Sequence, residues 1–257
     1  MLGAIAGDII GSIYEAAPIK TKDFPLFGPG VRFTDDSVCT VAVADALMQG
    51  GDFADTLRAY VRRFPGRGYG GMFARWAMTP GLPAYGSWGN GAAMRVSPIA
   101  HWARDEAELL DLAAASAAVS HDHPEAIAGA QAVALAMWLA RRGSERSEIR
   151  ATIERRFGYD LEQCVDQIRA WYRFDVSCKG TVPPAIVCAL EAEDYQNAVR
   201  NAISLGGDSD TLACITGGIA EILYGLPDEV GREARALLDV PLRAVVDRFY
   251  EKVAGDA

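Results

Sequence analysis

The sequence predicts an all-α protein, and three of its features support this fold class. Strand-type alternation of apolar and polar residues is nearly absent along the 257 residues. Apolar residues instead recur at helical spacing in successive segments, and glycine and proline separate these segments. Because hydrophobic residues make up 50% of the chain, it can bury a substantial core. We therefore expect residues 1–257 to form a single compact domain of many helices.

Helical periodicity and boundary residues place the individual elements. The expected helices span residues 3–16, 38–48, 53–64, 72–78, 92–102, 105–119, 126–140, 145–158, 160–173, 185–193 and 195–204, followed by one helix after Asp208 and two short amphipathic helices within 228–253. The Val182-Pro183-Pro184 triplet is expected to start the helix over 185–193. Residues 17–33 and 79–91 are rich in glycine and proline and are expected to be loops.

The first helix carries a stripe of small residues. Gly3, Gly7 and Gly11 are four residues apart, so this helix can approach another backbone closely, at some cost in helix propensity. Glu15 falls at its expected C-terminal end, where the helix dipole disfavours a carboxylate. Such an acid has either a cationic partner or a function, and a solvent-exposed helix end is the alternative.

Two clusters of oxygen-bearing side chains come directly before apolar helices. The first cluster contains Thr34, Asp35 and Asp36, and the second, after Gly206-Gly207, contains Asp208, Asp210 and Thr211. Helix capping explains one such residue in each cluster, with a second in the first turn, because a helix N-terminus favours negative charge. It does not readily explain four carboxylates with two threonines. Hard oxygen ligands of this kind are typical of a site for Mg²⁺ or a similar ion.

Glycine-rich loops offer binding features of a different kind. The segment 66–71 is flexible backbone before a helix start, which can hold a phosphate. In 86–91, Trp88 lies between glycines and beside Asn90, which suits stacking on a flat ring such as a nucleobase. The alternative is a tryptophan that closes over the core of its own loop.

A short histidine-containing segment precedes the helix over 126–140. His121 and His123 lie among acids, but Pro124 and Glu125 make this segment a good helix start, so zinc binding is disfavoured. One histidine here could contact an anionic ligand, and a capping or surface role is the alternative.

Composition excludes several functional classes. The formal net charge of −9 argues against general nucleic-acid binding, which needs a basic surface. No apolar run reaches the roughly 18 residues of a membrane span, and the first residues lack the basic segment of a signal peptide. The five cysteines are scattered without a CxxC pair, which fits a reducing cytoplasm. We expect a soluble, cytoplasmic monomer.

Seven segments, in the same order, resemble the ADP-ribosylglycohydrolases. They are GAIAGDIIGSIYEA, FTDDSV, RGYGG, GSWGNGAAMRVSPIA, the Ser-His pair at 120–121, VPPAIVCAL and SLGGDSDTLACITGGIAEILYG, and together they span residues 3–225. This is a family of all-helical enzymes with two magnesium ions that includes the dinitrogenase reductase-activating glycohydrolase. The GSIYEA and GSWGNG segments look closest to the branch that contains human ADP-ribosylhydrolase 3.

The resemblance implies a role for particular residues. It implies two Mg²⁺ ions, or Mn²⁺ in their place, held by Thr34, Asp35, Asp36, Asp208, Asp210 and Thr211. It implies that Glu15 is catalytic. The diphosphate and adenine would contact Ser87, Trp88, Gly89, Asn90 and Gly91, with further contacts from Gly68, Gly70 and His121.

The reaction implied is hydrolysis of the C1″ glycosidic bond of ADP-ribose on serine or arginine side chains, or in related conjugates. Two alternatives stay open: a module that binds ADP-ribose without cleaving it, and a metal-dependent hydrolase of another nucleotide-like substrate. The sequence departs from the human branch member at Trp88, where that protein has a smaller aromatic residue, and in the shorter segment 142–180. The linkage cleaved and the role of Glu15, as base or in substrate gating, are left open.

Overall fold

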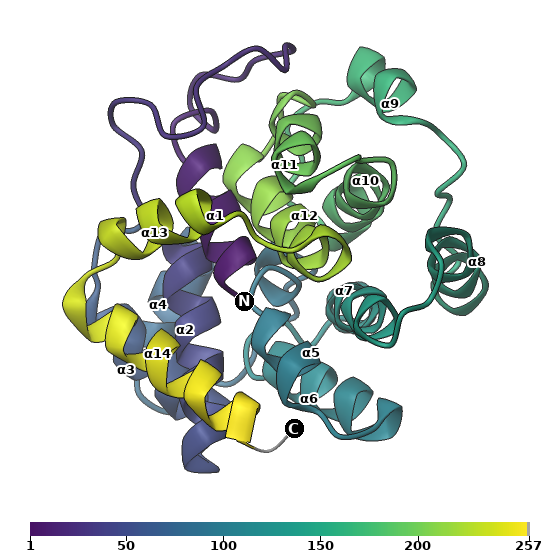
Figure 1. Ribbon diagram of the computed structural model, residues 1–257. Helices are drawn as coiled ribbons and strands as arrows, with labels where there is room; N and C mark the ends of the chain where they lie inside the picture. Colours follow the sequence, from purple (N-terminus) through teal and green to yellow (C-terminus); the bar gives the residue numbers. More distant parts are fainter. Residues whose placement is uncertain (256–257) are drawn as a thin grey trace.

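The computed structural model of the protein describes residues 1–255, and regular secondary structure in this range is entirely helical (Figure 1). The α-helices are α1 Leu2–Gly11, α2 Asp35–Gln49, α3 Phe53–Arg63, α4 Gly71–Met78, α5 Ser97–Trp102, α6 Glu106–Ala118, α7 Pro124–Arg141, α8 Arg146–Phe157, α9 Val165–Trp171, α10 Cys178–Leu190, α11 Tyr195–Ile203, α12 Ser209–Tyr224, α13 Asp228–Leu237 and α14 Val240–Gly255. A short 3₁₀ turn, η1, covers Asn90–Ala92. The predicted all-α class is confirmed.

The first and the twelfth helix lie side by side in the middle of the molecule (Figure 1). Helices α10 and α11 pack on one side of α12, and α7 contacts it as well. Helix α2 lies beside α3 and α14, whereas α5 and α6 pack on α7. Side chains from all these helices form one buried hydrophobic cluster. Within residues 1–255, no helix combines the length and the apolar character needed to cross a membrane.

Two predicted helix boundaries are wrong. The first helix ends at Gly11 rather than at residue 16, and Glu15 lies beyond it in a bend of the chain. Helix α10 begins at Cys178, because the Ser177 hydroxyl accepts a hydrogen bond from the backbone N–H of Gly180 and caps the helix. The two prolines expected to start that helix therefore lie inside it.

Two further expected helices are shorter than predicted. Residues 92–102 divide into η1 and α5, and 160–173 contains only α9. The long loop over 17–33 is present, and two side chains hold it to the body of the protein. Lys20 Nζ donates to the carbonyls of Tyr172 and Arg169, both at 2.9 Å. Arg200 donates to carbonyls of the loop at 2.7 and 2.6 Å.

The glycine stripe of α1 faces the backbone of α12, as the spacing predicts. A Cβ atom on Gly7 would lie 2.0 Å from the carbonyl oxygen of Ala213, and one on Gly11 would lie 2.6 Å from Cα of Asp210. On the opposite helix, a Cβ on Gly217 would lie 2.4 Å from the carbonyl of Gly3. Only hydrogen atoms fit between these backbones.

This contact predicts a large effect of one methyl group. We expect Gly7→Ala to lower the free energy of unfolding by about 3 kcal/mol or more, because a backbone carbonyl cannot rotate away from the new side chain. Urea unfolding followed by circular dichroism measures the loss. The control is Gly255→Ala, also in a helix, where a Cβ meets nothing within 4 Å and no loss is expected. Equal stability of the two variants would contradict the close contact.

Candidate functional site

A pocket of about 380 Å³ opens where the ends of α1, α2 and α12 meet. Its wall combines acidic side chains, glycine backbone, aromatic rings and one arginine. The lining residues are Glu15, Asp35, Asp36, Gly68, Gly70, Gly71, Met72, Phe73, Tyr85, Ser87, Gly89, Asn90, Gly91, Met94, Arg95, His121, Val176, Asp208, Asp210 and Thr211. We call this the acidic pocket.

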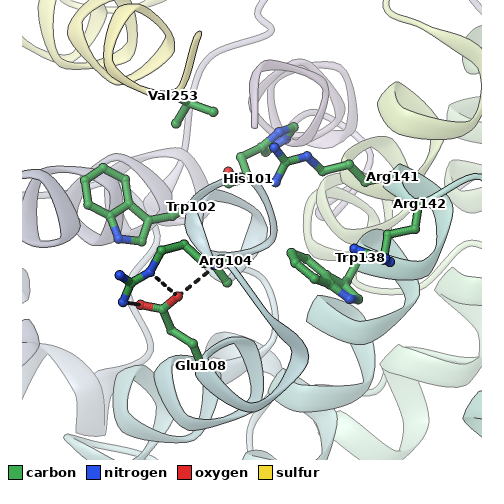
Figure 2. A pocket seen from close by; sticks show the side chains of 9 residues that line it. His101, Trp102, Arg104, Glu108, Trp138, Arg141, Arg142 and Val253 are labelled. Carbon is green, nitrogen blue, oxygen red and sulfur yellow. Dashed lines mark hydrogen bonds and ion pairs between the residues drawn. The ribbon is translucent and has the colours of Figure 1, made fainter. Parts of the chain in front are cut away.

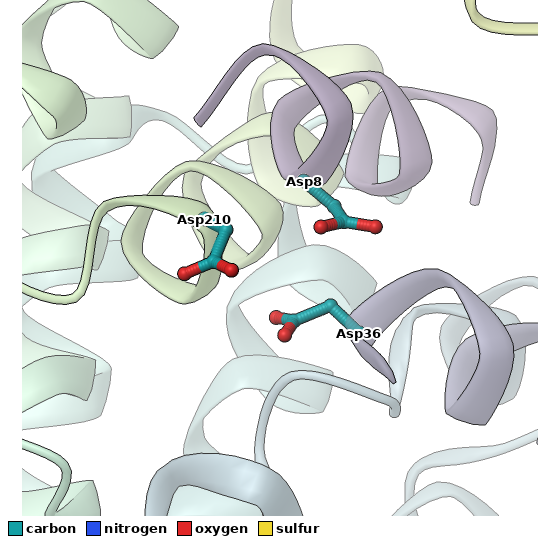
Figure 3. Close-up of side chains that lie close together, drawn as sticks. All are labelled: Asp8, Asp36 and Asp210. Atoms are coloured by element: carbon teal, nitrogen blue, oxygen red, sulfur yellow. The ribbon is translucent and has the colours of Figure 1, made fainter. Parts of the chain in front are cut away.

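Three carboxylates from three helices converge beside the acidic pocket (Figure 3). Asp8 comes from α1, Asp36 from the first turn of α2, and Asp210 from the first turn of α12. Each offers one oxygen, and these oxygens lie within 4.8 Å of one another. All three residues are buried. Two of them lie at helix N-termini, where the macrodipole partly compensates their negative charge.

Asp8 connects α1 to the start of α2. Its Oδ2 accepts hydrogen bonds from the backbone N–H groups of Thr34 and Ser37, at 3.0 and 3.1 Å. Both hydroxyls donate to the same carboxylate, with Thr34 Oγ1 at 2.5 Å from Oδ1. Thr34 also caps α2, because its Oγ1 accepts from the N–H of Asp36. Asp8 thereby fixes where the first predicted acidic cluster lies.

A second group of carboxylates shares Asp210 with the first. Oxygens of Glu15, Asp208 and Asp210 lie within 4.8 Å of one another. Asp208 accepts a hydrogen bond of 2.7 Å from Asn90 Nδ2, which ties the second acidic cluster to the predicted 86–91 loop. The fold therefore places two overlapping carboxylate triads side by side.

Burial of these acids close together raises their pKa values. Burial raises the pKa of Asp35 to about 8, and the negative charge of Asp8 adds to the effect. The pKa values of Asp36 and Asp210 are raised well above their usual range by burial and by neighbouring carboxylates. The pKa of Glu15 is also raised, by burial and then by Asp208, whereas Arg32 opposes the shift.

The donor set fits divalent cations. Every group in the two triads is a carboxylate, the ligand type that Mg²⁺ and Mn²⁺ prefer. Asp36 Oδ1 is buried and has no hydrogen-bond partner among the described residues. A buried carboxylate oxygen without a partner is costly, and a cation would satisfy it.

The structure places most of the predicted site residues around the acidic pocket, and the exceptions are Thr34 and Trp88. The hydroxyl of Thr34 turns to Asp8 instead. Asp35 lines the pocket but belongs to neither carboxylate triad. Of the two histidines, His121 lines the pocket, while His123 caps α7 by accepting a hydrogen bond of 3.2 Å from the N–H of Glu125. The capping role considered for this segment is thus confirmed for His123.

Trp88 lies outside the acidic pocket. Its side chain is 49% exposed and borders a separate, shallower hollow together with Asp175 and Lys179. A tryptophan closed over the core of its own loop, the alternative considered above, is therefore wrong. The aromatic rings that line the acidic pocket are Phe73 and Tyr85.

Three contributing residues were missed by sequence reasoning. Asp8 falls inside the expected helix over 3–16 and receives no role there, although an acid in the middle of an otherwise apolar helix is the available signal. Arg95 gave no separate signal beyond its place in the GNGAAMR segment. Phe73 was counted only as part of a short apolar helix.

A larger hollow, of about 970 Å³, lies elsewhere and does not have this chemistry (Figure 2). Two of its three arginines have polar partners: Arg104 pairs with Glu108 at 2.9 Å, and Arg141 donates to the carbonyls at the end of α5. The third, Arg142, lies over the ring of Trp138 at 5.6 Å. Burial lowers the pKa of His101 to about 3, so its ring is neutral and weakly basic near neutral pH. The candidate site is therefore the smaller, acidic pocket.

Comparison with known proteins identifies the family. The family model for ADP-ribosylglycohydrolase matches residues 1–256, nearly the whole chain. The chain belongs to the ADP-ribosylglycohydrolase family. The resemblance described above is confirmed at the level of the family and of the enzyme class.

Relatives within the ADP-ribosylglycohydrolase family are distant but cover most of the chain. The chain is 27% identical to ADP-ribosylhydrolase ARH3 of Danio rerio, across 88% of this chain and 82% of the relative. It is 26% identical to ADP-ribosylhydrolase ARH3 of Homo sapiens, across 88% and 84%. It is also 26% identical to ADP-ribosylarginine hydrolase Tri1 of Pseudomonas putida (strain GB-1), across 88% and 70%.

A solved structure described as an ADP-ribosylglycohydrolase-related protein complex shares the fold. The TM-score is 0.73 at 23% identity, and the match covers 97% of this chain and 96% of the other. This likeness supports the arrangement of helices that forms the acidic pocket.

The position of Asp8 predicts a stability effect at Ser37. Ser37→Ala removes a buried hydroxyl that donates to the Asp8 carboxylate, so we expect a loss of about 1.5–3 kcal/mol in the free energy of unfolding. Ser116→Ala is the matched control, because that buried hydroxyl donates to a neutral carbonyl, of Ala113, and a smaller loss is expected. Urea unfolding measures both variants. A larger loss for the control would contradict the linking role of Asp8.

Proposed function

We propose that the protein is a divalent-metal-dependent hydrolase that cleaves the C1″ glycosidic bond of ADP-ribose conjugates and releases ADP-ribose. The observation that carries the proposal is the pair of carboxylate triads, sharing Asp210, at a pocket that is also lined by glycine backbone and His121. The relatives named above are an ADP-ribosylhydrolase and an ADP-ribosylarginine hydrolase. Family, pocket and names together favour an ADP-ribose substrate over another nucleotide-like one.

The two triads suit two Mg²⁺ ions, with Mn²⁺ as a possible substitute. We propose that Asp8, Asp36 and Asp210 bind one ion and that Asp208 and Asp210 supply part of the coordination shell of the other ion. Thr34, Asp35 and Thr211 are retained as further candidate ligands. The ions would supply Lewis-acid polarisation and orientation of the ribose hydroxyls. Neutralising the buried acids is the physical reason for the fit.

We propose that Glu15 acts on the attacking water or on the leaving group. It lies in a bend outside any helix, and its pKa is raised by burial and by Asp208. A carboxyl group with a raised pKa can exchange a proton nearer to neutral pH than an ordinary one. The reaction would pass through a transition state with oxocarbenium character, as in glycoside hydrolysis.

We propose that the remaining pocket residues bind the ADP part of the substrate. Gly68, Gly70, Gly89 and Gly91 leave room for the diphosphate, since glycine lets a ligand approach the backbone. Further candidates for this part are Ser87, Trp88, Asn90 and His121. The exposed ring of Trp88 would have to stack outside the acidic pocket. Linkage to serine, arginine or another ADP-ribose stays open, since an ADP-ribosylhydrolase and an ADP-ribosylarginine hydrolase are equally similar to this chain.

The partner we propose is an ADP-ribosylated protein or a related conjugate. All five cysteines are unpaired and four of them are buried, which supports the expected reducing cytoplasm. A monomer remains our expectation for the assembly state.

Removal of divalent cation provides one test. In the folded, metal-free protein Asp35 keeps its proton up to about pH 8, whereas in the unfolded chain it loses the proton near pH 4. The free energy of unfolding of the metal-free protein therefore falls as pH rises across that range. A bound cation abolishes this loss of stability. We therefore expect the rise in melting temperature caused by Mg²⁺ over EDTA to be larger at pH 8 than at pH 6.

The variant Asp210→Asn should lose this Mg²⁺-dependent rise together with activity, because Asp210 belongs to both triads. Asp111→Asn, an exposed carboxylate on α6, is the control and should behave as the unmodified protein. Full activity in EDTA, or a shift independent of pH, would count against the proposed metal site.

Substitution of Glu15 tests the chemistry. We expect Glu15→Gln to keep ADP-ribose affinity and to lower turnover by on the order of 10²-fold, because proton transfer contributes about this much. Release of ADP-ribose from serine-, arginine- and poly-linked conjugates, separated by chromatography, is the measurement. Glu148→Gln, exposed on α8, is the matched control.

Product analysis also separates the rival functions. Free ADP-ribose supports the glycohydrolase, whereas released phosphate or a nucleoside monophosphate indicates hydrolysis of another bond. Tight binding of ADP-ribose with no release from any conjugate would indicate a binding module. Normal turnover of Glu15→Gln would remove Glu15 from the mechanism.

A further inference from the structure

Arg95 is a buried cation at the wall of the acidic pocket with no carboxylate partner. Its side chain is fully buried, and no ion pair is formed by it among residues 1–255. Nε and Nη1 have no hydrogen-bond partner there either. A buried charge of this kind is costly and is retained where it has a role.

The C-terminal end of α6 holds the guanidinium. Nη2 donates to the carbonyl of Ser116 at 2.7 Å and to that of Ala117 at 3.4 Å. The Ala117 carbonyl also accepts from the backbone N–H groups of Ser120 and His121, at 3.2 and 2.8 Å. The helix dipole places partial negative charge at this end of α6. The guanidinium also lies 5.7 Å from the ring centre of Phe73, a favourable cation–π distance. The arginine is thus fixed by dipoles and not by an acid.

The third contact of Nη2 leads towards the pocket. It donates to the Ser120 hydroxyl at 3.1 Å, and that hydroxyl lies 2.8 Å from Nδ1 of His121. Arginine can only donate, so the Ser120 oxygen is an acceptor in the first of these bonds. The single hydroxyl hydrogen then has one partner among the hydrogen bonds of the described residues, which is His121 Nδ1.

The Ser120 oxygen has two lone pairs, so Nδ1–H could donate to it, but the buried hydroxyl hydrogen would then have no partner among the described residues. The arrangement that satisfies both groups has the hydroxyl donating to Nδ1, and the neutral ring then carries its hydrogen on Nε2. Burial and the positive charge of Arg95 hold the pKa of His121 well below its usual range, so the ring stays neutral. Nε2 faces the glycine loop: a Cβ on Gly91 would lie only 3.1 Å from it.

We propose that Arg95 and Ser120 are positioning residues that orient His121 as an Nε2–H donor to the anionic diphosphate of the substrate. The proposal rests on the ADP-ribose substrate class proposed above. The pocket lining thus combines carboxylates with Arg95 and the His121 donor. The Nε2–H donor, with the positive charge of Arg95 behind it, favours an anionic group beside His121.

The tautomer is directly measurable in the protein without substrate. The chain has three histidines, so ¹⁵N-histidine labelling gives a simple spectrum. We expect His121 to show a protonated Nε2 and an unprotonated Nδ1 from pH 6 to pH 8. A protonated Nδ1 in the unmodified protein would overturn the proposal, whichever substrate the enzyme cleaves.

Ser120→Ala tests the hydrogen bond between the Ser120 hydroxyl and His121. We expect a mixed tautomer signal for His121 and a Kd for ADP-ribose that is about 3- to 10-fold higher, the effect of one lost hydrogen bond. KM should rise by a similar factor with little change in kcat, because the diphosphate is bound equally in ground and transition states. Ser97→Ala is the control: it removes a buried hydroxyl that has no hydrogen-bond partner among the described residues, so no change is expected.

A double-mutant cycle shows whether Ser120 acts on binding through His121 or independently of it. On a His121→Ala background, Ser120→Ala should leave the Kd unchanged, because the serine acts only through the histidine. Independent, additive losses would overturn the proposal. If the unmodified protein binds no ADP-ribose, the proposed function fails, and the tautomer spectra still decide whether Arg95 and Ser120 fix the imidazole.

Discussion

The close contact of α1 and α12 is the constraint on which the site depends. Two backbones approach so closely that a single methyl group on Gly7 would overlap a carbonyl of the opposite helix. Asp8 follows Gly7 directly, and Gly11 packs on the backbone of Asp210. The missing side chains therefore set the distance between two of the three converging carboxylates. Packing at this contact and chemistry in the pocket are parts of one arrangement.

Buried negative charge opposes folding at this same place. The acids raise one another's pKa values, and hydrogen bonds from α2 to Asp8 compensate only part of the cost. Helix N-termini at α2 and α12 compensate a further part. A bound cation would neutralise the negative charge that is left uncompensated, so the site without a cation carries excess negative charge. Stability given up at a functional site is a common trade-off in enzymes.

The lining of the pocket combines groups of opposite electrostatic character. Carboxylates at the starts of α2 and α12, with Glu15, line it together with Arg95 and the neutral His121. The C-terminus of α6 holds the arginine, since the carbonyls of Ser116 and Ala117 accept hydrogen bonds from it. A substrate that carries both hydroxyl groups and a diphosphate matches this combination. Family membership and pocket geometry thus support the same kind of ligand for independent reasons.

Local sequence determined the helices, the glycine stripe of α1 and the two acidic clusters at helix starts. These features depend on periodicity and on residues adjacent in the chain, which a sequence displays directly. The start of α10 at Cys178 differs from the predicted one, because capping by Ser177 competes with the proline signal. The end of α1 at Gly11 also differs from the predicted one. Only the tertiary structure brought Asp8 to Thr34 and Ser37, turned Trp88 out of the pocket and joined Arg95 to His121 through Ser120. Such contacts join residues from different helices and loops, and the packing of whole helices decides them, so no local pattern encodes them.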